Sequence, residues 1–183
     1  MRILGIDPGS LVTGYGVVER RGAAVVHVAH GTLRPPREAK LAARLAAIHE
    51  GIRHVIAAHR PDLVVIEQVF VAANVRAALV LGQARGVALA AASGAGLTVD
   101  ELSPQEVKRA VVGSGAARKA QVQRMVQRLL TLESAPAQDA ADALAAALCR
   151  AHQGVLAALR TPAATRRRAN RKAWTGFVLR RAR

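Results

Sequence analysis

The first ten residues constrain the fold more than any other stretch of this 183-residue chain. The apolar run 3–6 is typical of a strand, Asp7 follows it directly, and Pro8-Gly9 then ends it. A carboxylate at the end of a buried strand is costly unless a cation meets it. Asp7 is therefore either a turn cap, held by Asx hydrogen bonds, or one member of a charged site.

The following segments predict a sheet that combines both strand directions. Thr13–Glu19 and Ala24–Leu33 alternate between apolar and polar residues, which favours an antiparallel meander with the first strand. Glu38–His59 has the period of a helix, and Leu63–Ile66 is a continuous apolar strand that ends on Glu67. A strand–helix–strand crossover should place this strand beside the first one and parallel to it.

A long helix is predicted from about residue 74 to residue 92. It carries Gly82, Gly86 and Ala90 at spacings of four, and small residues on one face allow another backbone to approach closely. That backbone could belong to the sheet or to a second copy of the chain.

The second half adds one more strand and further helices. Thr98–Leu102 is predicted as the fifth strand, and Ser103-Pro104 begins a short helix. Residues 137–150 are strong helix formers, and Asp139 and Asp142, three apart, share one face of that helix.

The charge of the chain predicts a polyanionic partner. The net charge is +15 and the pI is about 11.7. Nine of the 27 Lys and Arg residues lie between Arg160 and Arg183, a stretch without acids. We therefore expect a folded domain over residues 1–153 and a flexible basic tail over 154–183. The tail is either a solvated extension or an arm for nucleic acid, in which Trp174 could stack on a base.

The single cysteine and the N-terminus bear on location. Cys149 lies in an Ala/Leu helix pattern and is expected to be a buried, inert thiol, which fits a reducing compartment. The sequence shows no signal-peptide pattern and, on inspection, no apolar run near the length that spans a bilayer. We expect a cytoplasmic protein without a membrane partner.

Four acids are expected to converge. Asp7 and Glu67 end neighbouring strands at one sheet edge, and a helix packed there could add Asp139 and Asp142. Four carboxylates repel one another strongly unless divalent cations are present, and all-oxygen ligands select Mg²⁺ or Mn²⁺. Two such ions beside a basic surface would suit hydrolysis of a phosphodiester, so the pattern indicates a metal-dependent nuclease or a related phosphoryl-transfer enzyme.

Seven segments, in order, resemble the RuvC family of Holliday junction resolvases. They are Leu4–Ser10 (LGIDPGS), Thr13–Gly16 (TGYG), Ile66–Phe70 (IEQVF), Leu81–Ala88 (LGQARGVA), Gln105–Lys108 (QEVK), Val111–Gly113 (VVG) and Gln138–Ala143 (QDAADA). The resemblance covers roughly residues 1–152 and implies an α/β, RNase H-like fold. Its five-stranded mixed sheet, three strands antiparallel and two parallel, would be flanked by helices.

The resemblance also implies roles for individual residues. The metal-binding and catalytic acids would be Asp7, Glu67, Asp139 and Asp142, and two Mg²⁺ or Mn²⁺ ions would be bound in each active site. Lys108 and Lys119 would act at the scissile phosphate, although both could instead lie on a solvated helix face. Phe70 would stack at the junction centre, or else serve as a core anchor. The remaining expected DNA contacts are Arg76, Arg109, Arg118 and Arg124. The family often has a lysine at the position of Ala73, whose phosphate contact Arg76 could replace.

The resemblance implies a homodimer that cuts two like strands of a four-way DNA junction, leaving 5′-phosphate and 3′-hydroxyl ends. It further implies RuvA and RuvB, the branch-migration proteins, as partners. Three other functions stay open from the residues: an ATP-binding enzyme of the actin or sugar-kinase type, a junction-binding protein that does not cut, and an RNase H-like nuclease acting on structured RNA. The first needs a second Asp-x-Gly loop and an adenosine-binding glycine motif, and neither is found in the sequence.

Overall fold

The computed structural model describes residues 1–68 and 74–160, and within them a five-stranded mixed sheet. Its strands are β1 (Arg2–Asp7), β2 (Thr13–Arg21), β3 (Ala24–Leu33), β4 (Leu63–Glu67) and β5 (Thr98–Leu102), in the order β3-β2-β1-β4-β5. The pairs β1–β2 and β2–β3 are antiparallel, and the pairs β1–β4 and β4–β5 are parallel. The predicted sheet and its crossover are therefore confirmed.

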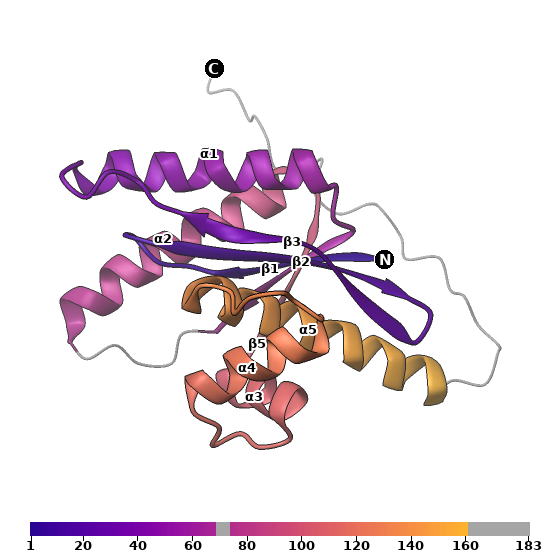
Figure 1. The fold of residues 1–183 in the computed structure, drawn as a ribbon. Coiled ribbons are helices and arrows are strands. Elements are labelled where there is room, and N and C mark those ends of the chain that lie inside the picture. The colour runs from indigo at the N-terminus through magenta and orange to yellow at the C-terminus, as the bar shows by residue number, and fades with distance from the viewer. Residues whose placement is uncertain (69–73, 161–183) are drawn as a thin grey trace.

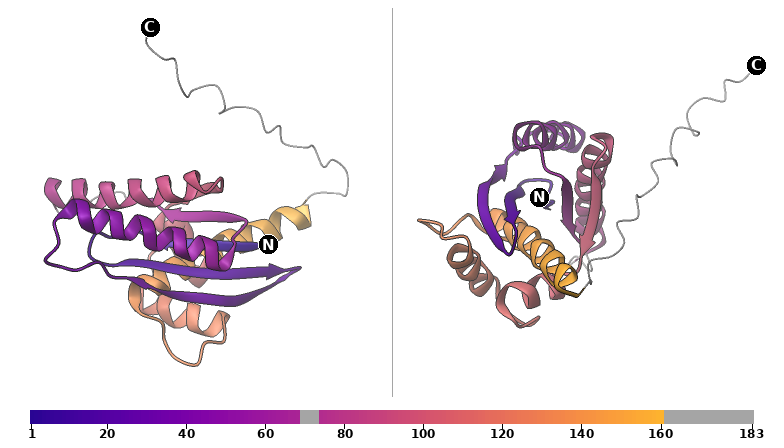
Figure 2. Two further views of the ribbon diagram at one scale, coloured as in Figure 1. Left: turned by 90° about the horizontal axis from the view of Figure 1, so that it is seen from above. Right: turned by 90° about the vertical axis from the view of Figure 1, so that its right-hand side faces the viewer.

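Helices cover both faces of the sheet (Figure 1). On one face lie α1 (Leu41–His59) and α2 (Val75–Gly94), whose buried side chains join those of the sheet in one apolar core. On the other lie α3 (Pro104–Val112), α4 (Lys119–Leu129) and α5 (Gln138–Arg160), around a second core. The end-on view in Figure 2 shows the sheet as the middle of three layers.

The helix α5 is the centre of the second face, and glycines decide how closely it packs. Gly5 in β1 pairs with Gly16 in β2, and both lie under α5. An added Cβ at Gly5 would lie 1.9 Å from the Ala143 carbonyl oxygen, and one at Gly16 would lie 2.5 Å from the Leu144 side chain. Residues 143–149 of the helix are all buried, including Cys149. The predicted burial of Cys149 is thereby confirmed. Burial also raises the pKa of its thiol to about 11.

Three element boundaries differ from the sequence-based expectation. The helix α1 begins at Leu41 rather than Glu38, because Pro35-Pro36 is followed by a turn in which the Ala39 amide donates to the Pro36 carbonyl. The strand β2 ends at Arg21 rather than Glu19, because the turn to β3 centres on Gly22, whose φ of 61° is in the left-handed region. The helix α5 continues to Arg160, whereas the sequence predicted a helix over residues 137–150. The division into a domain over residues 1–153 and a tail over 154–183 stays a prediction.

The helix α2 bears on two expectations, the absence of a membrane-length apolar run and the packing partner of its small residues. By length and composition alone, its 20 residues could cross a bilayer, so the expectation that the chain has no such apolar run was wrong. The reason is its composition of Ala, Gly, Val and Leu with only Arg76 and Arg85 charged. Core helices of soluble proteins pass the same test. An added Cβ at Gly82 or Gly86 would meet nothing within 4 Å. Within the described residues, these glycines therefore do not serve packing on the sheet.

Candidate active site

Two acids lie together at one edge of the sheet because of strand register. In the parallel pair β1–β4, Ile6 pairs with Ile66, so the next residues, Asp7 and Glu67, emerge side by side. Side chains alternate along a strand, and Asp7 follows Ile3 and Gly5 on the face that α5 covers. Both carboxylates therefore point toward the helical layer that carries the remaining acids, as predicted.

The N-terminal part of α5 brings Asp139 and Asp142 to this edge. Gly14 pairs with Asp7 across the β1–β2 ladder, and an added Cβ at Gly14 would lie 2.0 Å from the Asp139 carbonyl oxygen. The helix thus rests on bare backbone directly beside Asp7, as closely as it does further along at Gly5. A side chain at Gly14 would push both acids of α5 away from Asp7.

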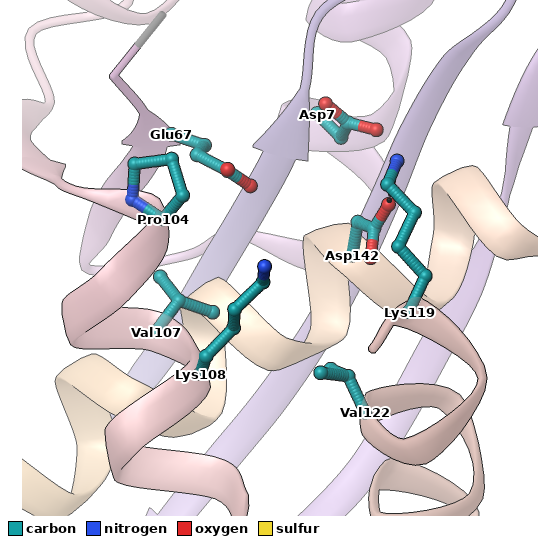
Figure 3. Close-up of a pocket in the computed structure, with 8 residues that line it drawn as sticks. All are labelled: Asp7, Glu67, Pro104, Val107, Lys108, Lys119, Val122 and Asp142. Carbon is teal, nitrogen blue, oxygen red and sulfur yellow. Dashed lines mark hydrogen bonds and ion pairs between the residues drawn. The ribbon is translucent and has the colours of Figure 1, made fainter. Parts of the chain in front are cut away.

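These elements enclose a cleft that contains three of the four predicted acids (Figure 3). Its lining residues are Asp7, Glu67, Pro104, Val107, Lys108, Lys119, Val122 and Asp142. The volume of about 90 Å³ can be compared with the ~30 Å³ that one water occupies in the liquid. A nucleotide would need a pocket of at least roughly 300 Å³. The cleft therefore suits small hydrated ions and one phosphate group better than a whole ATP molecule.

The acids of the cleft resist ionisation. Burial, followed by the negative charges of Asp142 and Glu67, raises the pKa of Asp7 from 3.8 to about 7. Burial and the charge of Asp142 also raise the pKa of Glu67. The pKa of Asp142 is raised mainly by burial, against the opposing effect of Lys119. Positive charge in the cleft is what would allow all three acids to ionise together.

Two lysines already supply part of that charge. The Lys119 ammonium donates a hydrogen bond of 3.1 Å to Asp142 Oδ2, and its side chain is 65% exposed while that of Asp142 is 15% exposed. Burial disfavours the ammonium, but the charge and hydrogen bond of Asp142 together with the charges of Asp7 and Glu67 outweigh this, so the pKa of Lys119 is raised. Lys108 reaches the cleft from α3, opposite Lys119 on α4 (Figure 3).

Most of the chain matches one known protein family. Residues 3–150 match the family model described as crossover junction endodeoxyribonuclease RuvC. The chain belongs to the RuvC family. A RuvC of Halorhodospira halophila is 58% identical over 151 residues, which are 82% of this chain and 90% of the relative. A RuvC of Trichlorobacter lovleyi is 49% identical over 178 residues, 97% of this chain and 99% of the relative, so its match extends into the basic tail.

A solved RuvC has the same architecture. The structure of Thermus thermophilus RuvC in complex with a Holliday junction substrate matches with a TM-score of 0.80 and 34% identity. The match covers 86% of this chain and 96% of that one. The RNase H-like fold expected from the sequence is thereby confirmed.

RuvC nucleases imply a divalent metal ion, and the donor set of the cleft fits one. Asp7, Glu67 and Asp142 offer only oxygen, which suits hard cations. In the described residues, no three such side chains converge on one point, and Asp139 does not line the cleft. Asp139 is nevertheless near enough for its charge to raise the pKa of Asp7. Burial and mutual repulsion raise the pKa values of Asp7 and Glu67, and a cation beside them would favour their ionised forms. Lys119 donates its hydrogen bond to Asp142.

The other predicted DNA contacts lie outside the cleft of this RuvC-family chain. Three of them are exposed on the helical layer that carries Lys108 and Lys119: Arg109 in α3, Arg118 just before α4, and Arg124 within α4. Arg76 is exposed in the first turn of α2. Phe70 lies outside the described residues, as does Ala73.

Several residues that build the site were missed in the sequence. Pro104, Val107 and Val122 form its apolar wall, and Gly14 admits α5. The glycines of β1 and β2 carried a usable signal, because small residues recurring at a spacing of two mark the strand face on which a helix can pack closely. Nothing in the local pattern of Val107 or Val122 distinguishes them from ordinary core residues.

Proposed function

We propose that this chain resolves Holliday junctions as a metal-dependent endonuclease, acting in DNA recombination and repair. It would nick two like strands of the four-way junction symmetrically and leave 5′-phosphate and 3′-hydroxyl ends. The single observation that supports this most is the cleft that unites Asp7, Glu67 and Asp142 with Lys108 and Lys119 in a member of the RuvC family.

Asp7, Glu67, Asp139 and Asp142 are the residues that would bind two Mg²⁺ or Mn²⁺ ions. Bound ions of this kind activate water at neutral pH and neutralise charge on the leaving oxygen of a phosphodiester. The role of the chain itself is to hold the carboxylates in a half-buried cleft, where their charge is poorly solvated and a cation is strongly favoured. The cleft, of about 90 Å³, would receive one phosphate group between the acids and the two lysines.

Lys108 and Lys119 act on the phosphate. They enter the cleft from two different helices, so one phosphate between them could be contacted from both sides (Figure 3). An ammonium placed where negative charge develops stabilises the transition state without reorganisation. Lys119 must exchange part of its contact with Asp142 for a contact with DNA, which its 65% exposed side chain permits.

The DNA would lie over α3 and α4. Arg109, Arg118 and Arg124 extend the positive surface beyond the cleft, with Arg76 and Phe70 as further contacts. Phosphate contacts of this type make affinity depend steeply on salt. The Thermus thermophilus relative is described with a Holliday junction substrate, and this supports the same substrate here.

The enzyme would act as a homodimer, because two nicks at symmetric positions need two sites. The surface that fits a second copy is a stripe along α2, which we call the α2 stripe: Val75, Leu79, Gly82, Gly86 and Ala90. Val75 is 77% exposed and Leu79 is 64% exposed, which is unusual for large apolar side chains in neighbouring turns. The two glycines leave open space for the backbone of a facing helix. RuvA and RuvB would be partners in the cytoplasm.

The test is cleavage of a synthetic four-way DNA junction by the full chain with Mg²⁺ or Mn²⁺. Asp7→Asn keeps the size of the side chain but removes its charge, and we expect it to abolish nicking while junction binding survives. Glu133→Gln is the matched control, since Glu133 is exposed and lies outside the cleft. Undiminished cleavage by Asp7→Asn would refute the assignment.

The same assay separates the alternatives that the sequence left open. Preference for a structured RNA over the DNA junction would favour an RNase H-like RNA nuclease. Tight junction binding by the wild type without nicking, under any divalent metal, would favour a protein that only binds junctions.

A further inference from the structure

Thr13, at the first position of β2, has an environment that its place in the sequence did not reveal. It is the one polar side chain among the described residues that is buried in full, with 0% exposure. A buried hydroxyl is costly unless it is hydrogen-bonded, so its partners show what the position requires.

Both partners belong to one residue of the turn that follows Asp7. The Thr13 hydroxyl donates to the Gly9 carbonyl at 2.8 Å and accepts from the Gly9 N–H at 3.3 Å. Gly9 therefore has both of its backbone polar groups bound by one side chain. The preceding residue, Pro8, has no N–H and cannot add a bond of its own.

The turn is also sterically tight. An added Cβ at Gly9 would lie 2.2 Å from the Val12 carbonyl oxygen, so the backbone of the turn folds against itself at that point. Leu11, at the tip, is 41% exposed and contributes little packing. The buried ring of Pro8 and the two hydrogen bonds between Thr13 and Gly9 consequently fix the path of the chain between β1 and β2.

This turn connects the end of β1, which carries Asp7, to the start of β2, on which the N-terminal part of α5 with Asp139 packs. Gly9 follows Asp7 by two residues, and Thr13 precedes Gly14, which pairs with Asp7 and contacts the backbone of Asp139. Any change in the turn would reach the Asp7 carboxylate through Pro8, and would reach α5 through Gly14. Thr13 itself does not line the cleft.

We infer that Thr13 is a positioning residue of the active site, whose hydroxyl fixes the Asp7-Pro8-Gly9 turn and so holds the Asp7 carboxylate in place for a divalent cation. This rests on the proposed function, since it presumes that Asp7 binds the metal. Residues that orient a metal ligand without touching the metal typically change affinity or activity by about 10–100-fold when they are replaced.

The experiment compares Thr13→Val with Thr13→Ser in the full chain. Valine keeps the shape and the strand preference but removes the hydroxyl, whereas serine keeps the hydroxyl and loses only a methyl group. We expect Mn²⁺ affinity of the DNA-free protein, measured by electron paramagnetic resonance, to fall roughly 10–100-fold in Thr13→Val and less than about threefold in Thr13→Ser. Hydrogen exchange at the Gly9 amide should accelerate in the valine variant alone.

Two controls separate positioning from general destabilisation. Ile52→Val removes a buried methylene from the core on the opposite face of the sheet and should leave Mn²⁺ affinity unchanged. If Thr13→Val does not fold, Thr13→Ala provides the same comparison at smaller volume.

Equal Mn²⁺ affinity in wild type and Thr13→Val would overturn the inference, as would an equal loss in Thr13→Ser or in Ile52→Val. None of these results would affect junction cleavage by the wild type, which tests the proposed function separately.

Discussion

The helix α5 packs closely on the sheet because Gly5, Gly14 and Gly16 have no side chains. The substitution Gly5→Ala therefore tests how much the site depends on this close packing. The added methyl group would lie 1.9 Å from the Ala143 carbonyl oxygen and 3.1 Å from the Ala147 amide nitrogen. Contacts of real Cβ atoms essentially never fall below 3.0 Å, so α5 must retreat from the sheet by about 1 Å. Neither obstacle is a flexible side chain that could turn away.

Two effects of this retreat can be estimated. Overpacking of a filled core costs roughly 1–3 kcal/mol, slightly offset by the lower backbone entropy of alanine in the unfolded chain. For a domain of this size, this corresponds to a melting temperature lower by about 2–10 °C. Because α5 carries Asp139 and Asp142, the same shift moves them relative to Asp7, and a misplacement of 1 Å can reduce catalysis by about a hundredfold.

The assay is thermal unfolding followed by junction cleavage at a temperature at which the variant is still folded. Gly94→Ala is the control, because an added Cβ at Gly94 meets nothing within 4 Å. We expect a large loss of cleavage in Gly5→Ala, although residue 5 does not line the cleft, and almost none in Gly94→Ala. A Gly5→Ala enzyme with wild-type melting and cleavage would show that α5 does not depend on this contact.

Three further predictions follow from the charges and exposed surfaces. Folding raises the pKa of Asp7 from 3.8 to about 7, so the stabilisation from its protonation is complete below about pH 4 and is lost as pH rises through 7. In EDTA, Asp7→Asn should therefore melt above the wild type at pH 8, with a gap that closes by pH 4; a constant gap would contradict the raised pKa. Lys119→Met removes the ammonium that donates to Asp142, and cleavage should fall by about a hundredfold with little change in junction affinity. A loss seen only in affinity would place Lys119 in general DNA binding instead. Leu79→Glu puts a charge on the α2 stripe, and sedimentation should show the proposed dimer for the wild type and monomers for the variant; an unchanged dimer would exclude this surface.

The sequence by itself determined which elements form and where the first two acids lie. Alternation and apolar runs predicted all five strands, and the crossover placed β4 beside β1. Asp7 and Glu67 each end a strand, and residues of paired parallel strands share an edge, so their proximity was predictable. These features are local, because each depends on a few neighbouring residues and on one handedness rule.

Only the tertiary structure decided the remaining parts of the site. The approach of Asp142 to Asp7 depends on glycines more than a hundred residues earlier, and the Lys119–Asp142 contact joins two separate helices. Periodicity tells which residues share a face but not which distant backbone that face meets. The same reason explains α2, whose glycines fitted the sheet or another chain equally well until the fold left them exposed.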